Sequence, residues 1–240
     1  MSLASNEVPI DTASRARLDA ALVDLAATVY AAKDLEATLH ALVDGAVDAL
    51  PEIDHAGVSI AHRDGRLETL AGTDLLVWEL DAIQYDLGDG PCVYALREET
   101  VVTVEHAADD PRWPSFLERA TERGLRSQLG VSLYADKASM AGLNLYSTTA
   151  DTISPETVEM GRLFATHAAL ALGKAQRDQH LGTALTSRQM IGTATGVVME
   201  RYGMNRAKAF EYLVRISNLS NVKLRDIAQE FVDVADQRQP

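Results

Sequence analysis

The sequence predicts an α+β fold, in which a sheet with helices on one face is followed by a small three-helix domain. Three observations predict it. Apolar residues recur at helical spacing at the front of the chain, five strand-like runs follow Pro51, and helical spacing returns after Pro155 and continues to Val232. Helices that precede and follow a group of strands can cover one face of the sheet that those strands form.

The first half of the chain supplies the opening helices and most of the strands. Apolar residues repeat every three or four positions from Leu18 to Val29 and from Leu35 to Val47, which predicts one or two opening helices. The strand-like runs, each bounded by turn residues, are residues 56–61, 67–70, 100–104, 128–134 and 140–146.

The last part of the chain is helical throughout. From Pro155 to Leu185 the apolar spacing continues with no further proline and no run of glycines, which predicts a long helix that enters the C-terminal domain directly. A helix from about Leu185 ends at Tyr202, because Gly203 is a typical C-terminal stop.

Two further short helices follow. Asn205 can cap the second helix through its side-chain oxygen, and Ser220 or Asn221 can cap the third. The expected inward residues are Ala209, Phe210, Leu213 and Val214 in the second helix, and Leu224, Ile227, Ala228, Phe231 and Val232 in the third. Helices this short need packing partners to be stable, so we expect the three to pack on one another or on a partner chain.

Charge separates this C-terminal region from the rest of the chain. Residues 186–225 contain seven basic side chains and two acidic ones, a local charge of +5, whereas the whole chain carries −13. A positive surface on an otherwise negative protein can bind phosphates at one place while the remaining body repels polyanions. An ordinary solvated helix surface is the alternative reading of the same charges.

The order of residues in this region resembles the ANTAR family, the RNA-binding output modules of bacterial regulators that release transcription terminators. The matching residues are Ala194, Gly196, Met199, Ala209, Leu213, Arg215, Ser217, Asn221, Lys223, Leu224, Arg225, Asp226 and Ala228. The chain departs from the family pattern at Thr195, Val214 and Val222, where the family often has basic residues. These departures leave open how strongly the module binds phosphate.

The resemblance implies that RNA stem-loops are the partner. Small residues and leucines among the matches are close-packing positions. The expected RNA contacts are Arg215, Ser217, Asn221, Lys223 and Arg225, with Arg188 and Arg201 as weaker candidates. A DNA-binding regulator is the first alternative, because a basic three-helix module can also place its last helix in a major groove. Against it, the segment after Arg225 becomes acidic.

The body of the chain resembles a GAF domain, a sensory fold common in bacterial signalling, from about Arg17 to Leu172. Four short segments match the family: residues 88–92 (GDGPC), 110–114 (DPRWP), 124–127 (GLRS) and 142–147 (GLNLYS). It implies an antiparallel sheet of six strands or fewer, with helices on one side for dimer contacts and loops on the other over a cavity for a small-molecule ligand. The cofactor or ligand stays unknown, because the fold does not fix it.

Catalysis and metal binding find little support in the residues. The sequence contains no phosphate-binding glycine loop with its lysine, no nucleophile elbow and no paired zinc signature, so we expect no enzyme, no catalytic residues and no metal site. A GAF-type enzyme is kept as a minor alternative. Cys92 is the one cysteine of the chain; it is either a small buried residue or a possible redox-sensing thiol.

These observations combine into one expected organisation. Residues 1–14 form a disordered N-terminal lead, residues 15–173 a GAF-like sensor domain, and residues 174–240 a connecting helix with an ANTAR-like RNA-binding three-helix domain. The single cysteine and the interrupted apolar runs favour a cytoplasmic protein that does not enter a membrane. The long helix suggests a homodimer in which a signal reorders two output modules.

Overall fold

The computed structural model describes residues 10–31, 34–62, 64–98, 101–133 and 140–237. Most of the predicted disordered lead, and residues 100 and 134 of two predicted strands, lie outside these ranges. The chain divides into two compact units, unit 1 up to Gln176 and unit 2 from Arg177. Helix α1 (Thr12–Ala31) is the first element of unit 1.

Unit 1 contains an antiparallel sheet of five strands in the order β2-β1-β5-β4-β3. All five are predicted runs, with ends that differ by one or two residues. Their bounds are β1 His55–Ala61, β2 Leu67–Gly72, β3 Val101–Val104, β4 Ser127–Leu133 and β5 Met140–Ser147. The two central pairings, β1 with β5 and β5 with β4, run over seven residues each. The α+β class and the antiparallel sheet are as predicted.

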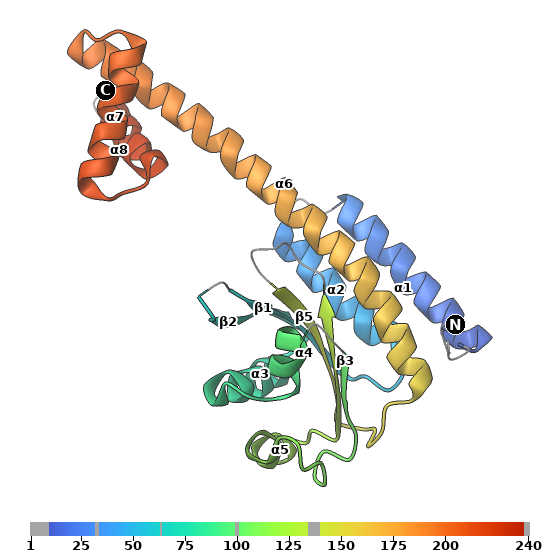
Figure 1. Cartoon of the computed structure of the whole chain (residues 1–240). Helices are drawn as coiled ribbons and strands as arrows, with labels where there is room; N and C mark the ends of the chain where they lie inside the picture. Colours follow the sequence, from blue (N-terminus) through green and yellow to red (C-terminus); the bar gives the residue numbers. More distant parts are fainter. Residues whose placement is uncertain (1–9, 32–33, 63, 99–100, 134–139, 238–240) are drawn as a thin grey trace, which may run out of the picture. The chain divides into compact units, whose positions relative to one another are not determined.

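Both faces of the sheet are covered. Helices α1, α2 (Leu35–Ala49) and the first part of α6 (Pro155–Tyr202) lie on one face, where the main apolar core is (Figure 1). The other face, where we expected loops, is also covered by helices: α3 (Leu75–Leu87) and α4 (Pro91–Glu98), with α5 (Pro114–Thr121) next to α3. Side chains alternate along β5, so Leu143 and Leu145 face the first layer while Tyr146 faces the second.

The predicted long helix is confirmed, because α6 runs for 48 residues without interruption and contributes to both units. In unit 2 its end packs with α7 (Arg206–Ser220) and α8 (Leu224–Asp236). The shared core consists of Ala194, Val198, Ala209, Leu213, Ile227 and Ala228. Asn205 caps α7 as predicted, since its side-chain oxygen accepts from the Lys208 N–H at 3.0 Å.

Three details of unit 2 differ from prediction. Val214 was expected to face inward but lines the outer groove of α7 instead of the core. Phe210 was expected to face inward but is 44% exposed, because α7 turns Ala209 and Leu213 toward the core and Phe210 lies beside them on the outer side. The N-cap of α8 is Lys223 and makes no side-chain capping bond. Ser220 is the last residue of α7, and Asn221 follows it as the C-cap. In the described part of the chain, no helix is long and apolar enough to cross a membrane.

Candidate nucleic-acid interface and the polar core of unit 1

The turn between α7 and α8 is built by two of the predicted RNA-contact residues. Asn221 adopts the left-handed conformation (φ 55°, ψ 32°), which asparagine tolerates better than most residues, and its N–H donates to the Ser217 carbonyl. The Ser217 hydroxyl donates to the Val222 carbonyl at 2.6 Å. Both side chains therefore have a structural reason to be present, and the turn places the residues that follow them.

Lys223 and Arg225 lie at the start of α8, directly after this turn. Both are exposed. No side chain caps the helix, so the positive end of its dipole and the two cations together favour an anion. The Arg225 Nε donates to Asp226 at 3.2 Å, an exposed pair that contributes little to stability and is easily exchanged for a phosphate.

The other basic candidates occupy the surfaces of α6 and α7. Arg215 is exposed on α7, two residues before Ser217. Arg201 lies over the ring of Tyr202 at 5.6 Å, and that ring contacts Tyr212 of α7 at 5.5 Å. Arg188 is exposed on α6, about 20 Å before Arg201 along the helix axis at 1.5 Å per residue. The structure thus brings together the candidates from Arg215 to Arg225 in one segment, and separates Arg188 from Arg201.

Most of these cations have no acidic partner. Among the residues that the structure describes, no ion pair is present for Arg188, Arg201, Arg206, Lys208, Arg215 or Lys223. The acidic residues of α8, Asp226, Glu230, Asp233 and Asp236, are exposed. Unit 2 therefore presents free positive charge at the α7–α8 turn and negative charge along α8.

Unit 1 contains a polar cluster that the sequence analysis missed. Asp81 of α3 is completely buried between α3 and the sheet and has no cationic partner among the described residues. One carboxylate oxygen accepts from the hydroxyls of Thr69 (2.6 Å) and Ser59 (3.2 Å). The other accepts from the Asn144 amide (3.0 Å) and from the Tyr146 hydroxyl. Three strands thus supply four donors to a single carboxylate.

Burial dominates the electrostatics of this cluster. It raises the pKa of Asp81 because a charge is costly away from water, although the four donors act in the opposite direction. Burial and the nearby Asp81 also raise the pKa of Tyr85, whose hydroxyl donates to Ser59 at 2.6 Å. The sequence does contain a signal for this cluster. A polar residue stands between two apolar ones in two strands, as in Val58-Ser59-Ile60 and Leu143-Asn144-Leu145, so the polar side chain points to the opposite face of the sheet from its neighbours.

Cys92 borders the same cluster in α4. Its side chain is fully buried, and its backbone N–H donates to Gln84 at 2.8 Å. Burial, together with the charge of Asp81, raises the pKa of the thiol. Redox-sensing cysteines combine exposure with a lowered pKa, so the geometry of Cys92 favours the packing role over the redox role.

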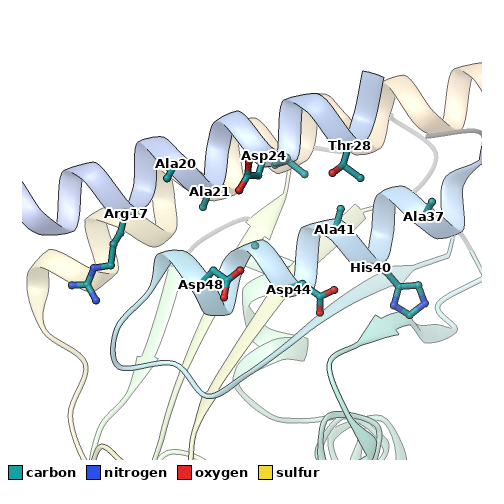
Figure 2. Close-up of a pocket in the computed structure, with 12 residues that line it drawn as sticks. Arg17, Ala20, Ala21, Asp24, Thr28, Ala37, His40, Ala41, Asp44 and Asp48 are labelled. Carbon is teal, nitrogen blue, oxygen red and sulfur yellow. The ribbon is translucent and has the colours of Figure 1, made fainter. Parts of the chain in front are cut away.

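The described surface pockets of unit 1 lie away from the polar cluster. One of about 530 Å³ lies between α1 and α2. Figure 2 shows alanines on both helices, with Asp24 on α1 and Asp44 and Asp48 on α2. Another, of about 990 Å³, is an open groove between the segment after β3 and the start of α6. Among the described residues, no group of three or more histidine, cysteine or acidic side chains could hold a metal ion.

Comparison with solved structures places unit 1 in a known fold. The GAF domain of a phosphoenolpyruvate-protein phosphotransferase from Coxiella burnetii is 19% identical; the match covers 69% of this chain and 98% of that one, with a TM-score of 0.53. The N-acylhomoserine lactone-dependent LuxR-family transcription factor CepR2 from Burkholderia cenocepacia is 16% identical, with 65% and 93% covered and a TM-score of 0.54.

A third similar structure is the phycoerythrobilin-bound GAF domain of a cyanobacterial phytochrome. It is 15% identical, the match covers 72% of this chain and all of that one, and the TM-score is 0.52. At these identities the likeness shows the fold alone. No protein of curated function matches the chain in sequence.

Family comparison agrees with the division into two units. The ANTAR domain family matches residues 179–232, which include α7, most of α8 and the end of α6. The GAF domain family matches residues 32–173, more than half of the chain. The chain therefore belongs to the GAF domain family and carries an ANTAR domain after it.

Proposed function

We propose that this protein is a bacterial signal-responsive regulator that binds RNA stem-loops through its ANTAR domain and thereby antiterminates transcription. The domain architecture is that of a signal-sensing regulator rather than a catalyst. The observation that carries the RNA proposal is the free positive charge at the α7–α8 turn of an otherwise acidic chain. In this proposal Lys223, Arg225 and Arg215 hold phosphates, and Ser217 with Asn221 fixes the turn that presents them.

RNA is favoured over duplex DNA by the charges of α8. A helix that enters a major groove brings its exposed side chains close to two phosphate strands. The exposed acidic residues Asp226, Glu230, Asp233 and Asp236 would be repelled there. An RNA hairpin loop contacts a smaller part of the module, so the start of α8 can bind it while Glu230, Asp233 and Asp236 stay in solvent.

The continuous α6 supports a mechanism for the signal. A helix transmits rotation or a change of pairing, which a flexible linker cannot. In the proposed mechanism a small molecule binds the GAF domain of a cytoplasmic homodimer, the two α6 helices change their pairing, and the two ANTAR domains reach the spacing of paired stem-loops. The GAF domain has a sensory role in this proposal and catalyses no reaction.

Fluorescence anisotropy tests the RNA proposal. The full-length protein is titrated with the best binder from a pool of two-hairpin RNAs with randomised loops, and with a DNA duplex of equal length, over a range of salt concentrations. Tighter binding to RNA is expected. In Lys223→Ala/Arg225→Ala, the slope of log affinity against log salt should fall by about 0.7 for each lost phosphate contact.

A matched control removes two positive charges from unit 1. Arg97 and Arg119 are exposed in the last turns of α4 and α5, so Arg97→Ala/Arg119→Ala should leave RNA affinity and salt slope unchanged. A preference for the duplex would support the DNA-binding alternative. Absence of binding to both nucleic acids would contradict a nucleic-acid output.

Insertion of two glycines after Gln176 tests the role of α6. The insertion interrupts the helix at the boundary of the two units. If α6 sets the spacing of two ANTAR domains, the insertion should weaken binding to two hairpins and leave binding to a single hairpin unchanged. Equal affinities for the double hairpin, with and without the glycines, would remove α6 from the mechanism.

A further inference from the structure

Helix α7 carries a shallow groove on the side away from the core of unit 2. We call it the α7 groove; it has a volume of about 360 Å³ and is lined by Phe210, Glu211, Val214, Arg215, Asn218 and Leu219. Phe210 is 44% exposed and Leu219 is 78% exposed, although Leu213 on the opposite side of the same helix is completely buried. The volume of the α7 groove is at the low end of that of small-molecule sites, and like such sites it combines apolar with polar side chains.

The polar side chains of the α7 groove are free to bind a ligand. Glu211, Arg215 and Asn218 make no side-chain hydrogen bond or ion pair with any residue that the structure describes. The groove therefore combines an aromatic ring, an amide, a carboxylate and a guanidinium, each with its bonding capacity unused.

This combination matches the chemistry of an unpaired nucleobase. A base presents a flat π-face that stacks on an aromatic ring, and a polar edge that an amide or a carboxylate can read. A carboxylate accepts only, so Glu211 selects an edge that donates, namely an exocyclic amino group. A phosphate next to the base would meet Arg215 of α7, the helix that the turn joins to Lys223 and Arg225.

Charge argues for RNA over a second copy of this chain as the occupant. Residues 186–225 carry a local charge of +5, so two such surfaces repel each other while a polyanion is attracted. We propose that the α7 groove binds one unpaired base that carries an exocyclic amino group, from the loop of the RNA. Phe210 stacks on this base, Glu211 and Asn218 read its edge, and Arg215 holds the adjoining phosphate. This inference rests on the proposed RNA-binding function.

Fluorescent base analogues test the proposal directly. The full-length protein is titrated with the selected two-hairpin RNA, in which 2-aminopurine replaces one loop base at a time; stacking on Phe210 should quench it at one position. Phe210→Leu keeps an apolar side chain but removes the ring, so it should abolish that quenching and weaken RNA binding about 10-fold. Phe210→Tyr should retain both. Val234→Ala, which removes an exposed apolar side chain from α8, is the control.

The edge-reading role has its own readout. Replacement of a loop guanine by inosine, or of a loop adenine by purine riboside, removes the amino group from the base. At the loop position where 2-aminopurine is quenched, this replacement should weaken RNA binding by the wild type about 10-fold. It should change the RNA affinity of Glu211→Ala little, because that variant already lacks the carboxylate. The salt slope should be the same for wild type and Phe210→Leu, because no phosphate contact is lost.

The outcomes separate this inference from the proposed function. Unchanged affinity and quenching in Phe210→Leu, while Lys223→Ala/Arg225→Ala still weakens RNA binding, would overturn the base site alone. A lower mass of Phe210→Leu in sedimentation equilibrium, with unchanged RNA affinity, would assign the groove to a second copy and also overturn it. No RNA binding by the wild type would overturn both proposals.

Discussion

Unit 1 encloses polar side chains, whereas unit 2 leaves its charged side chains in solvent. In unit 1 the carboxylate of Asp81 is fully buried and accepts four hydrogen bonds from the sheet. In unit 2 the fully buried positions are apolar apart from Thr195, and the basic side chains make almost no ion pairs in the described structure. A buried, satisfied network specifies one arrangement of a core. Surface cations without an acidic partner can pair with an anion of another molecule without first breaking an ion pair. The two units therefore differ in where their polar groups act, inside the core in unit 1 and at the surface in unit 2.

Removal of the Asp81 carboxylate should have the largest effect on stability. Asp81→Ala leaves the donors of Ser59, Thr69, Asn144 and Tyr146 buried without their acceptor, and each such donor costs about 1–3 kcal/mol. Some can bond one another, so we expect a loss on the order of 4 kcal/mol in the free energy of unfolding of unit 1. Both tryptophans, Trp78 and Trp113, lie in unit 1, so tryptophan fluorescence during urea unfolding reports this loss.

Asp86 provides the matched control on the same helix. Its side chain is exposed, and Asp86→Ala should change the free energy of unfolding by less than about 0.5 kcal/mol. If Asp81→Ala costs no more than Asp86→Ala, the buried network does not stabilise unit 1, and the contrast between the units loses its main support.

Truncation of Leu213 should have a slightly smaller effect, confined to unit 2. Leu213 is fully buried in a core of six residues, and Leu213→Ala should cost about 3 kcal/mol. Helical circular dichroism should decrease at lower urea concentration, while tryptophan fluorescence stays unchanged because both tryptophans are in unit 1. Leu219→Ala, at a position 78% exposed, should leave both signals unchanged. A shift of the tryptophan transition in Leu213→Ala would show that the two units unfold together.

The pH dependence of stability distinguishes the protonation states of Asp81. Its folded-state pKa is raised above the ordinary 3.8, so its contribution to stability is complete below that pH and is lost as the pH rises through the folded-state pKa. The titratable groups that face it, Tyr85, Tyr146 and Cys92, also have raised pKa values and stay protonated. Asp81→Asn does not titrate. The free energy of unfolding of wild type minus that of Asp81→Asn should therefore fall as the pH rises above the ordinary carboxyl pKa of 3.8.

The opposite trend would carry a different meaning. If the difference rises with pH over this range, the four donors outweigh burial, and Asp81 is held as a carboxylate with a lowered pKa. Urea unfolding at several pH values, followed by tryptophan fluorescence, measures both proteins under identical conditions and cancels the contributions of all other titrating groups.

The parts of the fold that follow from local pattern could be predicted from the sequence. Strands such as β5 alternate in character, α6 continues because nothing interrupts its apolar spacing, and Asn205 caps α7 because its side chain reaches the N–H of Lys208. The group of basic residues around the α7–α8 turn could also be predicted, because its members are close in sequence.

The rest depends on contacts between distant residues. Asp81 meets Ser59, Thr69 and Asn144 only after the sheet has formed, and in the sequence a lone aspartate in a helix reads as a solvated charge. Phe210 was expected in the core together with Ala209 and Leu213, yet only Ala209 and Leu213 of these three are buried there, and the small side chain of Ala209 lets the helices approach closely. Asn221 was predicted as a possible N-cap of α8. It is the C-cap of α7 instead, because the turn requires a residue in the left-handed conformation at this position.

The smallest expected effect is the oxidation of Cys92. It tests whether the thiol, like the carboxylate of Asp81, is kept from solvent in unit 1. A thiolate is the reactive form, and burial with a nearby carboxylate raises the pKa of this thiol. Peptide mass mapping after mild peroxide should show no added oxygen on Cys92 in the folded protein, whereas the same treatment in urea should show oxidation of Cys92; the mapping separates Cys92 from the six methionines. Oxidation of the folded protein at a comparable rate would mean that α4 opens readily from the sheet. Unit 1 would then be a redox sensor whose buried cluster is exposed by motion. Its polar groups would be enclosed in the average structure but would still reach solvent at times.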